Sequence, residues 1–204
     1  MNMKVVPKSK PKAAGPSFTE HDVLELKVSL KNCETGVERT VLVRADITFG
    51  MLHYILQVAM GWDDHHLHEF KLGKTRVGME QEYDFFADDE VLLEEDHRLF
   101  ELLSACNGKF VYWYDFGDDW MHDIKAKVIP PAKAEGKKLP TCRAGTGACP
   151  PEDCGGVWGY AEMLEDLRTG SKTRKEELRE WLGGKFDPEA FDLKAVDRAL
   201  GHFR

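Results

Sequence analysis

Residues 22–44 read DVLELKVSLKNCETGVERTVLVR, and they carry the clearest structural signal of the chain. Leucine or valine stands at every even position from 24 to 30, with polar or charged residues between them, which is the period of a strand with one face in water. Asn32 to Gly36 supplies turn residues, and residues 37–44 alternate in the same way. This stretch therefore predicts an antiparallel β-hairpin.

A helix is expected directly after the hairpin. Apolar residues from Leu52 to Met60 recur at helical spacing between Thr48, a suitable N-cap, and Gly61, a helix stop. We expect this helix to pack across the hairpin, and a short helix capped by Asp96 to follow later. Further strands are predicted at residues 67–72, 76–79, 91–93, 109–115 and 120–128.

The C-terminal third differs in composition from the rest. Residues 130–159 are rich in proline, glycine and cysteine and are predicted to form a loop. Helical spacing then runs to Gly170, and a second helix should turn Leu178, Trp181 and Leu182 inward. Asp187-Pro188 is predicted to be an N-cap followed by an N1 proline, with a last helix beyond it.

These elements predict an α+β fold, with a hairpin, a helix and further antiparallel strands like an α/β roll or β-grasp, and a C-terminal helical annex. Residues 1–16 are predicted to be a disordered basic leader. Residues 17–204 form a single predicted domain, β-rich over 20–129, a loop over 130–159 and helical over 160–204.

Charge and hydropathy narrow the possible partners. The net charge is −8, and the leader carries four lysines and no acid, so the body is near −12. Such a body repels phosphate backbones, which argues against nucleic acid as its partner. No apolar run approaches the ~20 residues that span a bilayer. We expect a cytoplasmic protein without a membrane anchor, whose partner is a protein or small molecule.

The stretch from Tyr112 to Tyr160 is unusually dense in aromatic, acidic, glycine and thiol groups. Three thiolates and one imidazole would complete a tetrahedral zinc site, and the candidate ligands are Cys142, Cys149, Cys154 and His122. The alternative is that the cysteines are small buried residues and His122 is a core histidine. Zinc is therefore a candidate cofactor.

The same stretch supplies a candidate binding surface. Its members are aromatic or acidic side chains: Tyr112, Tyr114, Asp115, Asp118, Trp120, Glu152, Asp153 and Trp158. The acids could bind a cation or act as an acid/base pair, although turns also recruit aspartate for its backbone hydrogen bonds. His65, His66 and His68 could hold a metal too, or form a polar entry to a strand.

Several strings resemble those of a known family. They include Ala59-Met60-Gly61-Trp62, Tyr114-Asp115-Phe116-Gly117-Asp118, Cys149-Pro150-Pro151-Glu152-Asp153-Cys154-Gly155-Gly156 and Phe186-Asp187-Pro188-Glu189. Residues 20–200 are similar in this way to the Ri-plasmid ORF-three-like family, whose members are often labelled insertion-element passenger proteins of TnpR type. The resemblance implies an α+β fold and no settled activity. The chain departs from the family by its leader and by an acidic insertion around residues 79–96.

The favoured hypothesis is a non-enzymatic binding or accessory module, associated with mobile genetic elements, that uses the Tyr112 to Tyr160 surface. The alternative is a metal-dependent hydrolase-like or nuclease-like enzyme that uses Asp115, Asp118, Glu152 and Asp153. We see no recombinase pattern that would support the resolvase sense of the TnpR label.

Overall fold

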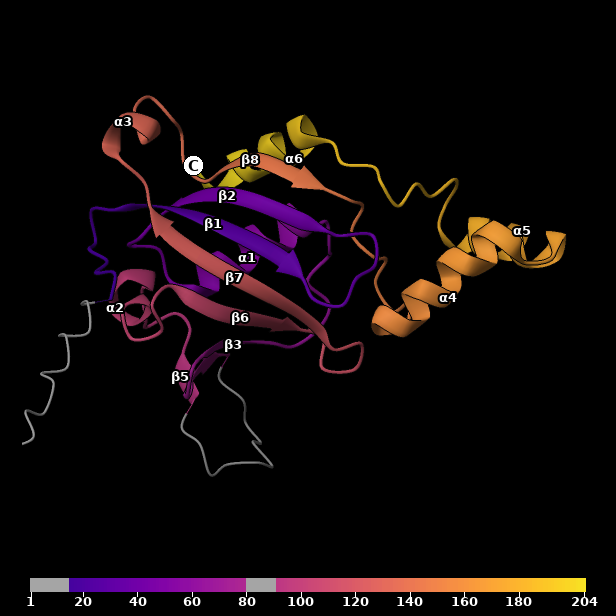
Figure 1. The fold of residues 1–204 in the computed structure, drawn as a ribbon, viewed down its shortest axis with the longest axis horizontal. Helices are drawn as coiled ribbons and strands as arrows, with labels where there is room; N and C mark the ends of the chain where they lie inside the picture. The colour runs from indigo at the N-terminus through magenta and orange to yellow at the C-terminus, as the bar shows by residue number, and fades with distance from the viewer. Residues whose placement is uncertain (1–14, 80–90) are drawn as a thin grey trace, which may run out of the picture.

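A computed structural model describes residues 15–79 and 91–204, and within them eight strands form one sheet in the order β5-β4-β3-β6-β7-β1-β2-β8 (Figure 1). The strands are β1 (Val23–Leu30), β2 (Glu38–Arg44), β3 (His68–Leu72), β4 (Thr75–Gly78), β5 (Val91–Leu93), β6 (Lys109–Tyr114), β7 (Trp120–Val128) and β8 (Thr141–Thr146). Paired strands are antiparallel except β4 and β5. The predicted α+β class and the hairpin β1–β2 are confirmed.

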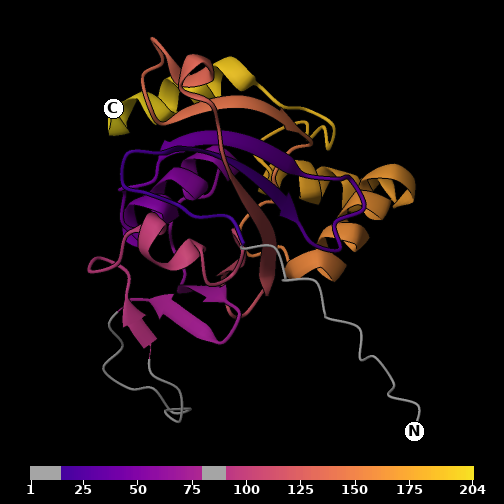
Figure 2. The same cartoon turned by 60° about the vertical axis from the view of Figure 1, so that its left-hand side comes forward.

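The helix α1 (Phe49–Met60) covers one face of this sheet (Figure 2). Its ends follow the predicted signals: Met51 N donates to Thr48 Oγ1 at 3.1 Å, and Gly61 ends the helix with φ +105°. Its inward residues meet the even-numbered apolar positions of β1, all of which are buried. The core therefore lies between α1 and the middle of the sheet.

One predicted boundary in the first half needs correction, and two predicted segments lie largely outside the described residues. The helix α2 (Leu99–Leu103) begins after Arg98, not after Asp96, because the Glu101 carboxylate turns back and accepts a hydrogen bond from Arg98 N at 2.7 Å. The leader falls outside the described residues up to position 14. Positions 80–90 of the acidic insertion also lie outside them.

The predicted loop over residues 130–159 contains regular structure. The single turn α3 (Pro131–Ala134) is followed by β8, which pairs with the edge of β2. The sequence of β8, Thr-Cys-Arg-Ala-Gly-Thr, lacks the apolar alternation of a strand, and Cys142 is its only buried residue. Backbone pairing to β2 therefore places this edge strand, since most of its own side chains are not buried.

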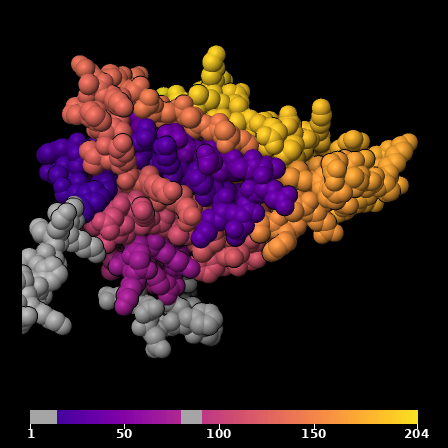
Figure 3. Space-filling view, viewed as in Figure 1, coloured from indigo at the N-terminus to yellow at the C-terminus, as the bar shows by residue number. Residues whose placement is uncertain are grey.

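The C-terminal helices lie in two places on the molecule. The pair α4 (Gly156–Thr169) and α5 (Lys172–Trp181) extends beyond one end of the sheet (Figures 1 and 3). By contrast, α6 (Leu193–Ala199) and the 3-10 turn η1 (Leu200–Phe203) return along β8 and α1. Among the described residues, no helix is both long and apolar enough to cross a membrane.

Two details of this region differ from the sequence prediction. Trp181 was expected to face inward but is half exposed, because α5 packs on α4 alone along most of its length. Asp187-Pro188 forms a turn in which Asp187 Oδ1 accepts a hydrogen bond from Glu189 N at 3.1 Å. The last helix lies beyond this turn, as predicted, and the Asp192 carboxylate caps its first turn.

Candidate functional site

Four side chains from three separate segments meet beside the turn between β6 and β7. His66 precedes β3, Asp115 follows β6, and Glu152 and Asp153 precede α4. The His66 Nε2 atom lies 3.6 Å from Asp115 Oδ2, 3.7 Å from Glu152 Oε2 and 3.3 Å from Asp153 Oδ1. We call these four residues the His66 cluster. One imidazole nitrogen therefore faces three carboxylates.

Asp115 is oriented by its own turn. The residue has φ +55°, and its Oδ1 atom accepts hydrogen bonds from Gly117 N at 2.9 Å and Asp118 N at 3.3 Å. Aspartate tolerates this left-handed conformation because its short side chain bonds the local backbone. With Oδ1 occupied, the Oδ2 atom of this buried carboxylate points to His66.

Glu152 is oriented by the sheet. Its Oε1 atom accepts hydrogen bonds from the Tyr114 hydroxyl at 2.9 Å and from Asp63 N at 3.1 Å. Burial, together with the Glu152 carboxylate, raises the pKa of the Tyr114 phenol well above its ordinary value, so the phenol stays a proton donor. The second oxygen, Oε2, is left facing His66.

The start of α4 is fastened to the same turn. Gly155 N donates to Asp118 Oδ2 at 3.1 Å, so the turn that holds Asp115 also holds the segment after Asp153. Gly156 has φ +66°, and a Cβ there would lie 2.4 Å from the Asp118 carbonyl oxygen. Glycine is required at this position because both the conformation and the close approach exclude a side chain.

Gly156→Ala is expected to lower the free energy of unfolding by about 2 kcal/mol, as the alanine adds a backbone clash to the cost of the left-handed conformation. The matched control is Gly36→Ala, which has the same φ of +66° but no atom within 4 Å of the added Cβ. It should cost about 1 kcal/mol. Urea unfolding of both variants measures the difference, and equal losses would show that the contact with Asp118 is unimportant.

The atoms at the centre of the His66 cluster lack hydrogen-bond partners. Both His66 Nε2 and Glu152 Oε2 are buried and, within residues 15–79 and 91–204, make no hydrogen bond despite their proximity. A metal bound at about 2.1 Å places neighbouring ligand atoms about 3.0 to 3.4 Å apart, for octahedral and tetrahedral angles respectively. The three distances from His66 Nε2, 3.3 to 3.7 Å, need only a small contraction to match. The ligand atoms of His66, Asp115 and Asp153 also lie within 4.8 Å of one another. The cluster thus has the donor set and spacing of a cation site.

A second histidine group has similar spacing but different geometry. The rings of His53 and His68 are stacked, with centroids 3.5 Å apart and planes at 6°. Ligating lone pairs lie in the ring planes, so two parallel stacked rings cannot direct both of them at one ion. Each ring instead meets its own carboxylate: His53 with Asp64 at 2.8 Å and His68 with Glu94 at 2.7 Å. This group is a buried hydrogen-bond network, in which burial lowers the pKa of His53.

The predicted zinc ligands Cys142, Cys149, Cys154 and His122 are arranged differently from the two histidine groups. His122 is fully buried, with Nδ1 3.2 Å from the Tyr112 carbonyl oxygen, and burial raises the pKa of the Cys142 and Cys149 thiols. Among the described residues, sets of three ligand atoms within 4.8 Å of one another occur in the two histidine groups above, not among these thiols and His122. Zinc at Cys142, Cys149, Cys154 and His122 stays a prediction.

The predicted binding surface is divided by the structure. Tyr112, Tyr114 and Trp120 are fully buried, because the face of β6 and β7 that carries them lies under α1, so their rings cannot form a surface platform. Trp158 is 85% exposed on α4. The acids at 115, 152 and 153 do converge.

His66 is the member that sequence reasoning did not connect to the acids. Sequence position groups His66 with His65 and His68, whereas its partners Asp115 and Glu152 lie 49 and 86 positions further along the chain. The available signal was weak: a histidine just before a strand, and an aspartate just after another.

The fold and the cluster define an α+β protein whose mainly antiparallel sheet carries a histidine and three carboxylates at one end. The chain belongs to the plasmid pRiA4b ORF-3-like protein family, whose model matches residues 22–195. It is 38% identical over 183 residues to "Uncharacterized protein y4hQ" of Sinorhizobium fredii (strain NBRC 101917 / NGR234), covering 87% of this chain and 90% of the relative.

A solved structure has the same fold. The crystal structure of the protein of unknown function MM3350 from Methanosarcina mazei Go1 matches with a TM-score of 0.74 and 35% sequence identity. The match covers 86% of this chain and 97% of that protein. These relatives establish family and fold, and they supply no activity.

Proposed function

We propose that the protein binds a divalent metal ion through His66, Asp115 and Asp153, with Glu152 as a fourth ligand. The observation that carries this proposal is the buried His66 Nε2 atom, which has no hydrogen bond to any described residue and faces three carboxylate oxygens. One imidazole with carboxylates suits Mn²⁺, Fe²⁺ or Zn²⁺, whereas Ca²⁺ and Mg²⁺ prefer oxygen ligands alone.

The exposure of the cluster favours a bound metal ion with one coordination position open to solvent. The Asp153 side chain is 74% exposed, while those of Asp115 and Glu152 are 8% and 16% exposed. A structural site closes all positions around its ion, and a catalytic site leaves one for water. This observation favours metal-assisted hydrolysis as the chemistry of the site, in which the ion lowers the pKa of a bound water. A metal-binding accessory module without catalysis is the second candidate.

Binding of Mn²⁺ and Zn²⁺ to the full chain by calorimetry tests the metal proposal. We expect Asp115→Asn to weaken binding at least tenfold, because it removes one anionic ligand from the ion. The matched control is Asp119→Asn, which changes an acid of the same turn outside the cluster, at a left-handed residue where asparagine is tolerated. Equal affinities of these two variants would contradict the proposal.

Metal content also separates this site from the thiol site. Cys149→Ser should leave the bound metal unchanged if the His66 cluster holds it, and should release zinc if Cys142, Cys149, Cys154 and His122 do.

Hydrolytic activity is tested by assaying the Mn²⁺-loaded protein on bis(p-nitrophenyl) phosphate. Activity that is lost in Asp115→Asn and kept in Asp119→Asn would support the hypothesis of a hydrolytic enzyme. If the wild type shows no activity, the metal-binding accessory module is the favoured function.

We place the protein in the cytoplasm, since its five cysteines are all free thiols. An association with mobile genetic elements is supported only by the plasmid in the family description. The net charge of −8 supports a protein or small-molecule partner over nucleic acid.

A further inference from the structure

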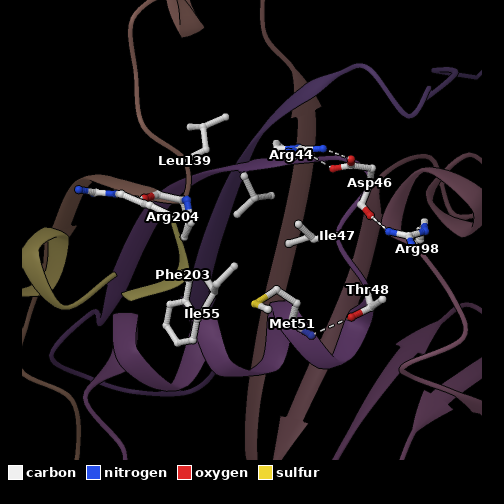
Figure 4. Close-up of a pocket in the computed structure, with 12 residues that line it drawn as sticks. Arg44, Asp46, Ile47, Thr48, Met51, Ile55, Arg98, Leu139, Phe203 and Arg204 are labelled. Carbon is white, nitrogen blue, oxygen red and sulfur yellow. Dashed lines mark hydrogen bonds and ion pairs between the residues drawn. The ribbon is translucent and has the colours of Figure 1, made fainter. Parts of the chain in front are cut away.

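A separate pocket lies beside the first half of α1 (Figure 4). It is formed between the first half of α1, the segment before it and the C-terminal turn η1, and has a volume of about 360 Å³. Its floor is apolar, with Ile47, Met51, Ile55 and Phe203 pointing into it (Figure 4). None of these residues belongs to the proposed metal site, so the two sites can be tested independently.

Three arginine side chains line the rim of the pocket around this apolar floor. Arg44 is paired with the Asp46 carboxylate, and Arg204 with Asp197 at 2.7 Å. Arg98 donates to the backbone oxygen of Asp46, and among the described residues it has no salt bridge to a carboxylate. In a protein with net charge −8, the pocket therefore presents one guanidinium that makes no salt bridge to a carboxylate of the described residues.

The helix N-terminus is not the anion donor here, although it lines the pocket. Phe49 N donates to His97 O, Gly50 N to Glu94 O and Met51 N to Thr48 Oγ1, so the amides of the first turn already have acceptors. An anion would have to take its hydrogen bonds from Arg98.

We propose that this pocket binds a small amphipathic carboxylate, with its head group on Arg98 and its apolar body over Ile47, Met51 and Ile55. A carboxylate matches the planar fork of one guanidinium, and its single negative charge would balance the positive charge of Arg98. A phosphate would bring a second charge close to Asp46. A volume of about 360 Å³ lies at the lower end of the range of small-molecule pockets, which suits a ligand with a short apolar chain.

Octanoate is the probe, titrated into the full chain and followed by amide chemical shifts in NMR spectra. A ligand of this size should bind with a Kd of about 1 mM. We expect octanamide, which has the same shape without the charge, to bind at least tenfold more weakly. Shifts should centre on residues 43–55 and on η1.

Arg98→Met should weaken octanoate binding about tenfold, and Ile47→Asn should weaken it by removing apolar contact. Arg98 is exposed and its backbone keeps the bond to Glu101, so the variant should fold. Lys74→Met, which removes an exposed cation outside the pocket, is the matched control and should bind normally. Equal affinity for octanoate and octanamide, unchanged binding by Arg98→Met, or shifts centred elsewhere would each overturn the proposal.

Discussion

Replacing Arg39 with methionine is expected to lower the free energy of unfolding by about 3–5 kcal/mol. Arg39 is buried, and its guanidinium donates to the backbone oxygens of Ala59 at 2.7 Å, Thr146 at 2.7 Å and Gly147 at 3.1 Å. These oxygens belong to the end of α1 and the end of β8. One side chain on β2 therefore joins the helix layer to the edge strand.

Methionine would fill part of the space but remove the Arg39 donors from the Ala59 and Gly147 oxygens, whose hydrogen bonds are buried. A buried polar group left unpaired costs about 1–3 kcal/mol. The variant also loses the contact of the guanidinium with the Phe191 ring, whose centroid is 4.3 Å away. Lysine would keep the charge without the planar fork, so Arg39→Lys should lie between methionine and the wild type.

Urea unfolding measures these differences. The matched control is Arg143→Met on β8, where the arginine is partly exposed and meets Glu25 at 3.6 Å. An exposed pair of this kind contributes about 0–1 kcal/mol. If Arg39→Met were no more destabilised than Arg143→Met, the carbonyl contacts of Arg39 would not be holding β8 to α1.

The hairpin and α1 are predictable from the sequence because their signals are local. Alternation of apolar residues identifies β1 and β2, and Thr48 and Gly61 mark the two ends of α1 within thirteen residues of each other. The strand β8 has no such signal. It depends on the distant Arg39 and on Gly145, where a Cβ would lie 2.5 Å from the Phe191 ring.

The candidate site is only half predictable for the same reason. Asp115, Glu152 and Asp153 could be selected by residue type, because acids gather in one stretch of the chain. Their convergence on His66 depends on the pairing of β3 with β6, which brings His68 opposite Tyr114. Pairing between strands so far apart in the chain is not visible in a single sequence without a register signal.

The free energy of unfolding is also expected to fall by about 3 kcal/mol between about pH 7.5 and about pH 4 because of His122 alone. The imidazole is fully buried between the Trp62 and Tyr112 rings, at 5.2 and 5.3 Å. Burial, with a smaller contribution from the Arg39 cation, lowers its pKa from 6.5 to about 4.

The sign follows from proton binding. Between pH 6.5 and about 4 the unfolded chain binds a proton at His122 that the folded chain does not, so lowering the pH favours unfolding. This stability is complete above the unfolded pKa and is lost as the pH falls toward the folded pKa.

Comparison of variants isolates this contribution from the titration of carboxylates. His122→Gln cannot take up a proton, so its loss of stability between about pH 7.5 and about pH 4 should be smaller than that of the wild type by about 3 kcal/mol. His21→Gln changes an exposed histidine and should keep the wild-type pH dependence. Parallel curves for His122→Gln and the wild type would mean that His122 is accessible to protons in the folded protein, and that the interior beneath α1 is less closed than its packing indicates.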